Sequence, residues 1–74
     1  MKIIEQIEKM AAFERKKLLS LSQRILPHIT TDDILQPQDF PELDENPEFR
    51  FQEGVCIGVE TALAALYAEM AHNG

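Results

Sequence analysis

The four prolines of this chain lie within one stretch, and their placement limits the fold more than any other feature. They recur at intervals of 10, 4 and 6 residues, at Pro27, Pro37, Pro41 and Pro47. Proline lacks a backbone N–H and disfavours helical angles in the residue before it, so no long helix can cross this stretch. The segments on either side, residues 1–26 and 48–74, contain no proline, and each is long enough for one long helix.

Residues 2–26 carry an apolar seam with helical spacing. Its positions step alternately by three and four residues, at Ile4, Ile7, Ala11, Glu14, Leu18, Leu21 and Ile25. This spacing is typical of a helix that packs along one side against another helix. Glu14 is the polar member of the seam. We expect it to pair with Arg50 or Arg24 or to fix the helix register, unless the seam turns towards solvent there.

The second helix is predicted at about residues 47–72. Asn46 can cap it, Pro47 suits its first position, and Glu48 places a negative charge in its first turn. The predicted seam is formed by Val55, Val59, Ala62, Leu66 and Met70. Apolar residues also lie on other sides of this helix, and the first helix can cover at most one of these sides.

The connector, residues 27–46, is both acidic and apolar. Residues 25–48 hold seven acidic groups and no Lys or Arg, whereas residues 1–24 hold six basic and three acidic groups. The apolar residues of the connector are Ile29, Ile34, Leu35, Phe40 and Leu43. Thr30 or Thr31 can cap a single turn. We therefore expect an ordered loop that packs over the helix pair.

The predicted fold class is all-α, with residues 1–74 forming one small helical domain. Two long helices form a helical hairpin, which we expect to be antiparallel, although the long connector also permits a parallel pair. A chain of about 60 residues buries only about 60% of its unfolded surface, so a two-helix hairpin has a thin core. We expect a homodimer that completes a four-helix bundle, or else a subunit that binds a different chain.

Composition excludes several classes of function. The net charge of −6 argues against binding to nucleic acid or anionic lipid, which depends on neutralising phosphates. One Cys and two distant His leave no zinc-ligand pattern, so we expect no metal and no cofactor. No apolar run reaches the roughly 18 residues that span a membrane, and no signal peptide precedes the first charges. We expect a soluble, cytoplasmic protein.

Gly54, Gly58 and Ala62 form a stripe of small residues at positions i, i+4 and i+8. Each glycine inside a helix costs about 0.5–1 kcal/mol relative to alanine, so the stripe predicts close approach of another backbone. We consider three roles for this stripe: packing against the first helix, a dimer contact, or one wall of a ligand groove.

Arg50 lies between two aromatic residues, Phe49 and Phe51. Consecutive helical side chains point about 100° apart, so both rings cannot face the same core. One ring is expected near the surface or under the connector, where Phe40 can meet it. Aromatic residues and Arg are favoured at interface centres. Phe40, Phe49, Arg50 and Phe51 are the predicted partner-binding residues, and simple burial by the loop is the alternative.

No motif for a catalytic site is present, and we predict no catalytic residues. The leading hypothesis is a non-enzymatic protein–protein interaction module, such as an adaptor, a small regulator or a chaperone-like subunit. It would bind through an apolar helix face and the acidic loop. The alternative is a small enzyme or an enzyme's accessory subunit that uses His28 with Asp32 or Asp33. A metal or cofactor carrier ranks third. Cys56 is expected to be a small buried hydrophobic residue.

Overall fold

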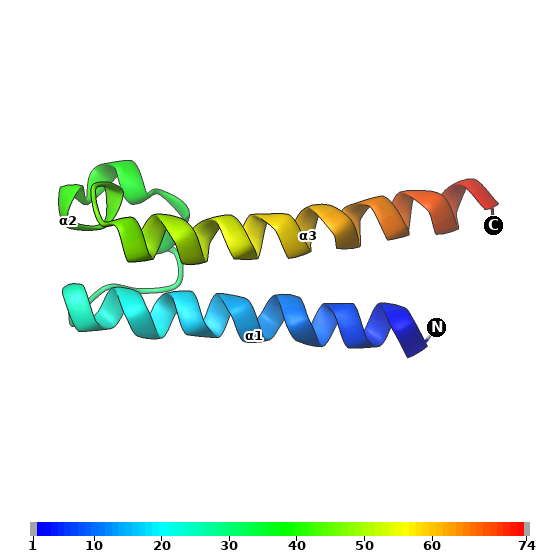
Figure 1. Ribbon diagram of the computed structural model, residues 1–74, viewed down its shortest axis with the longest axis horizontal. Coiled ribbons are helices and arrows are strands. Elements are labelled where there is room, and N and C mark those ends of the chain that lie inside the picture. The colour runs from blue at the N-terminus through cyan, green and yellow to red at the C-terminus, as the bar shows by residue number, and fades with distance from the viewer. Residues whose placement is uncertain (1, 74) are drawn as a thin grey trace.

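The computed structural model describes residues 2–73, with the backbone alone at Asn73. Two long helices, α1 (Lys2–Ile25) and α3 (Pro47–Asn73), lie side by side and antiparallel, so both chain ends lie at the same end of the hairpin (Figure 1). No strand occurs within the described residues, and the molecule is elongated, 43 × 19 × 19 Å. The predicted all-α hairpin is confirmed. Residues 1 and 74, which the predicted domain includes, lie outside the described part.

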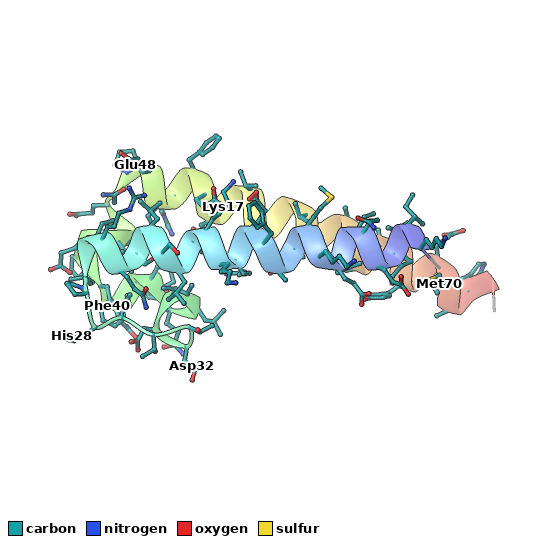
Figure 2. The ribbon with its side chains drawn as sticks, turned by 90° about the horizontal axis from the view of Figure 1, so that it is seen from below. Lys17, His28, Asp32, Phe40, Glu48 and Met70 are labelled. Atoms are coloured by element: carbon teal, nitrogen blue, oxygen red, sulfur yellow. The ribbon has the colours of Figure 1, made fainter. Side chains whose placement is uncertain are left out.

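The connector folds at the closed end of the hairpin and lies against one side of the helix pair (Figures 1 and 2). It contains two 3₁₀ turns and a short helix: η1 (Asp33–Leu35), η2 (Pro37–Asp39) and α2 (Pro41–Asp44). Pro37 and Pro41 each occupy the first position of their element, where the missing N–H has no helical partner to lose. The predicted ordered loop is confirmed.

Both predicted capping residues make hydrogen bonds. The backbone N–H of Phe49 donates to Oδ1 of Asn46 at 3.0 Å, and Pro47 is the first residue of α3. In the connector, the backbone N–H of Asp33 donates to Oγ1 of Thr30 at 3.3 Å. The N–H of Thr30 donates in return to Oδ2 of Asp33 at 2.9 Å. These reciprocal bonds form a capping box, and they identify Thr30 rather than Thr31 as the capping residue.

The main core lies at the closed end, and half of it comes from the connector. Six buried residues form it: Leu18 from α1, Phe49 and Cys56 from α3, and Ile29, Ile34 and Leu43 from the connector. The prediction that Cys56 is a buried hydrophobic residue is confirmed, and burial raises the pKa of its thiol.

The α1 seam is confirmed, whereas the predicted α3 seam is only partly correct. Every predicted seam position of α1 is buried or half-buried. On α3 the fully buried residues are Phe49 and Cys56. Of the predicted seam, Val55, Val59 and Leu66 are half-buried, whereas Ala62 and Met70 are exposed. The cause is that α3 has apolar residues on several sides. Spacing alone did not show which side would meet α1, and the connector covers the Phe49–Cys56 side.

Polar contacts between side chains hold α1 and α3 in register. The guanidinium of Arg15 donates two hydrogen bonds to the Glu60 carboxylate, from Nε to Oε2 and from Nη2 to Oε1, each 2.7 Å long. Nearer the chain ends, the Tyr67 hydroxyl donates to the carboxylate of Glu8. The Arg15 pair is bidentate, the geometry that gives an arginine–carboxylate contact its directional strength.

Glu14 supplies a third contact between the helices, but not with the partners expected. Its Oε2 and its backbone oxygen accept hydrogen bonds from Nε2 of Gln52, at 3.1 and 3.2 Å. Nζ of Lys17 donates to its Oε1 at 3.0 Å. The hydrogen bonds from Gln52 and Lys17 lower the pKa of Glu14. The expected pairing with Arg50 or Arg24 was wrong, because the antiparallel register places Gln52 opposite Glu14.

Because the connector completes the core, Leu43→Ala should destabilise the whole hairpin. Leu43 is fully buried, and truncation of a buried leucine costs about 2–5 kcal/mol. The matched control is Leu35→Ala in the same connector, where the side chain is 63% exposed, and we expect a change below about 0.5 kcal/mol. Urea unfolding followed by circular dichroism measures both. If Leu43→Ala and Leu35→Ala change the free energy of unfolding by equally small amounts, the connector does not contribute to the core.

Because of the Arg15–Glu60 pair, we expect the free energies of unfolding of wild type and Glu60→Gln to differ by an amount that depends on pH. The hydrogen bonds from Arg15 lower the pKa of Glu60 from its ordinary value of 4.5. The ionised Glu60 carboxylate therefore makes its full contribution to folding stability above pH 4.5. This contribution is lost as pH falls through the lowered folded-state pKa of Glu60. Glu60 is partly exposed and solvent screens the pair, so we expect Glu60→Gln to cost about 0.5–1 kcal/mol at neutral pH.

The free energy of unfolding of wild type and Glu60→Gln should converge below that pH, as measured by urea unfolding at several pH values. Glu53→Gln is the control, since the ion pair of Glu53 is formed with Arg50 within α3. A difference between wild type and Glu60→Gln that stays constant down to pH 2 would contradict the assignment.

Candidate functional site

The stripe of small residues faces away from α1. Gly54, Gly58 and Ala62 are all exposed, and a Cβ added at either glycine would meet no atom within 4 Å. Packing against the first helix, one of the three interpretations of the stripe, therefore does not occur in the single chain. The surface is smooth and unobstructed.

Most of α3 is apolar but exposed. An 18-residue window within Pro47–His72 has a mean hydropathy of 1.3, yet only 6% of the window is buried. No uninterrupted apolar run reaches 18 residues, but by length and composition α3 could cross a membrane. Helices covered by protein in solution pass the same test, so this finding assigns no location.

The four predicted partner-binding residues occupy different environments. Phe49 is fully buried in the core, and Phe40 is half-buried against the same core. Arg50 lies at the surface, where it pairs with Asp44 at 3.3 Å and Glu53 at 2.7 Å. Phe51 is 74% exposed. As expected, only one of the two neighbouring rings faces the core. Phe49 is covered within the chain and is not available as a surface contact.

Phe51 opens onto a groove of about 840 Å³ between α1 and α3. Residues 13–24 of α1 form one wall, and the first turns of α3 form the other. Figure 2 shows Lys17 and Glu48, which line this groove, on the opposite side of the helix pair from the connector residues Phe40 and Asp32. We call it the aromatic groove. Its lining residues are Phe13, Lys16, Lys17, Ser20, Leu21, Arg24, Pro47, Glu48, Phe51 and Gln52.

Cations gather on the α1 wall of the aromatic groove. Lys16, Lys17 and Arg24 line it, against one carboxylate, that of Glu48. Nζ of Lys17 lies 5.4 Å from the centroid of the Phe13 ring, within the range of a cation–π contact. Lys16 and Arg24 form no ion pair with any other described residue.

Sequence reasoning did not identify this groove. The signal was available: Phe13, Lys17, Ser20 and Arg24 follow one another at steps of four, three and four residues along a single side of α1. What the sequence did not show is that Phe51 would face them from α3, because the contact side of α3 was predicted only in part.

The residues of the enzyme alternative come together only in part. His28 and Asp33 line a second pocket of about 260 Å³, together with Phe40, whereas Asp32 does not line it. The Asp33 carboxylate accepts the backbone N–H of Thr30. No hydrogen bond joins His28 to either aspartate within residues 2–73. The same residues contain no group of three His, Cys, Asp or Glu side chains placed to hold a metal ion.

None of the protein-family models, curated proteins or solved structures compared with the chain matches it. The functional assignment therefore depends on the two exposed surfaces described above, the outer side of α3 and the aromatic groove.

Proposed function

We propose that this chain is a non-enzymatic protein–protein interaction module, an adaptor, small regulator or chaperone-like subunit that acts by covering its open α3 surface with another chain. One observation carries the proposal: the 18-residue window of α3 with a mean hydropathy of 1.3 is only 6% buried. Apolar surface left in water is unfavourable by roughly 25 cal/mol per Å², and large exposed apolar patches mark interaction sites.

The total surface of the chain supports a missing partner. The chain exposes 5292 Å². A compact monomeric protein of 8.4 kDa exposes about 4,600 Å². The excess of about 700 Å² is close to the ~800 Å² that one partner buries in an interface of standard size. Covering one long side of the hairpin would therefore bring the exposed surface to an ordinary value.

The simplest partner is a second copy, and the proposed assembly is a homodimer that completes a four-helix bundle. Two hairpins that pack through α3 bury the same surface on both chains, as twofold symmetry requires. The Gly54, Gly58 and Ala62 stripe supports close approach, since no side chain holds off another backbone there. A hetero-oligomer in which a different helical chain covers α3 is the alternative.

The acidic connector supplies the second element of the proposal. It contributes six carboxylates within residues 27–46 and no Lys or Arg, so it would attract a basic partner and disfavour an acidic one. Of the predicted contact residues, Arg50 and Phe51 in the first turns of α3 are exposed and remain as surface contacts. The enzyme alternative has weaker support, because the Asp33 carboxylate is already used in the capping box with Thr30.

Gly58→Leu should separate the dimer without unfolding the hairpin. The added side chain meets nothing within the chain, and leucine has a higher helix propensity than glycine. Between two chains, however, it would hold the backbones apart. Sedimentation equilibrium over a wide concentration range should give a dimer for wild type and a mass near 8.4 kDa for Gly58→Leu. Far-ultraviolet circular dichroism should show the same helical content.

Gly58→Ala is the matched control, since a single methyl group should leave the dimer largely intact. A wild-type mass near 8.4 kDa at every concentration would rule out the homodimer. If wild type and Gly58→Leu dimerise with equal affinity, the Gly54, Gly58 and Ala62 stripe is not part of the dimer interface.

A further inference from the structure

The aromatic groove is a second exposed surface that the core of the single chain does not use. Its apolar floor is formed by Leu21 and two aromatic rings, Phe13 at 60% and Phe51 at 74% exposure. Aromatic residues, Phe among them, are enriched at protein–protein interfaces. The groove lies between two helices that the Arg15–Glu60 pair and the core hold in place, so its walls are pre-formed.

The charge at the groove opposes that of the rest of the protein. The chain has a net charge of −6, yet the groove is lined by three cations and one carboxylate. Lys17 is partly neutralised by Glu14, at 3.0 Å, whereas Lys16 and Arg24 have no ion-pair partner within residues 2–73. An acidic ligand would therefore be attracted to this end of the molecule by two unpaired cations beside an apolar floor.

The shape of the groove indicates the form of that ligand. The α1 wall runs from Phe13 to Arg24, a length of about 16 Å, or three helical turns. An open groove between two helices accepts the apolar side of a third helix, with anchors at i, i+3 or i+4, and i+7. We propose that the aromatic groove binds an acidic amphipathic helix of another protein, whose apolar side packs on Phe13, Leu21 and Phe51 while its carboxylates pair with Lys16 and Arg24.

A second copy does not fit this groove well, although its connector is acidic and exposes Leu35. The connector lies on the opposite side of the helix pair from the groove (Figure 2). A contact between the connector of one copy and the groove of another would be head-to-tail, so it would build a ring or an open filament rather than a twofold dimer. Nucleic acid is disfavoured by the net charge of −6.

This inference rests on the proposed function only in taking the chain to be an interaction module. The groove and the Gly58 stripe are separate surfaces, since Gly58 does not line the groove. Peptide binding can therefore fail while the dimer survives, and the dimer can fail while the groove still binds.

The test uses fluorescence anisotropy with a labelled synthetic helix of about 14 residues, which is about 21 Å long. It carries Leu or Phe at i, i+4, i+7 and i+11, and Glu on the two flanking sides. Two control peptides accompany it: one has Lys in place of every Glu, and the other has the same composition in scrambled order. The full chain should bind the acidic amphipathic peptide at least about tenfold more tightly than either control. Binding should weaken severalfold between about 50 mM and 500 mM salt, because the pairs are at the surface.

Lys16→Glu with Arg24→Glu should weaken binding at least tenfold, and Phe51→Ala should weaken it to a similar extent. Lys9→Glu and Ile57→Ala are the matched controls. Each makes the same kind of change at an exposed position that does not line the groove, and neither should alter binding by more than about twofold. Circular dichroism verifies that every variant keeps its helical content.

Three outcomes of the peptide-binding measurements would overturn the proposal. These outcomes are that the acidic peptide does not bind, that the Lys-containing peptide binds equally well, or that Lys9→Glu weakens peptide binding as much as Lys16→Glu with Arg24→Glu does. Salt-sensitive self-association that Lys16→Glu with Arg24→Glu abolishes would assign the groove to a second copy instead, and would likewise overturn it.

Discussion

The structure depends on the packing of the connector against the closed end of the hairpin. Two antiparallel helices alone share only one line of contact, and their main core contains three helix residues, Leu18, Phe49 and Cys56. The connector adds three more from its short helical elements. Pro37 and Pro41 of the connector, and Pro47 directly after it, each begin a helical element, so the backbone turns sharply without losing helical hydrogen bonds. An otherwise long loop is thereby converted into a third layer over the helix pair.

This arrangement leaves the two ends of the hairpin unequal. Beyond Cys56, no residue of α3 with a described side chain is fully buried, although that part of α3 is rich in apolar residues. The outer half relies on the buried Ile4 and Ala11 of α1, on partly buried side chains of α3, on the Arg15–Glu60 pair and on the contact between Tyr67 and Glu8. The most apolar helix is thus the least covered. The proposed function follows from this imbalance, because a partner chain is the simplest way to remove that surface from water.

Much of the fold was predictable from local rules, whereas the surfaces were not. Proline positions, the Asn46 cap and the α1 seam each depend on residues close together in sequence, and each prediction was confirmed. The contact side of α3 is a tertiary property, because several of its sides are apolar enough to be buried. That error also hid the aromatic groove, which requires Phe51 and Phe13 to face the same space. The same error explains why Phe49, which is buried in the core, was predicted to contact a partner.

The central claim is that the closed end folds by itself while the outer part of α3 is stabilised by a partner chain. Hydrogen exchange measured by mass spectrometry at two protein concentrations, one below and one above the dimer dissociation constant, tests it most directly. We predict strong amide protection in residues 49–60 at both concentrations. Protection in residues 63–72 should be weak in the dilute sample and should rise in the concentrated one. Uniform protection along α3 that does not change with concentration would contradict the claim.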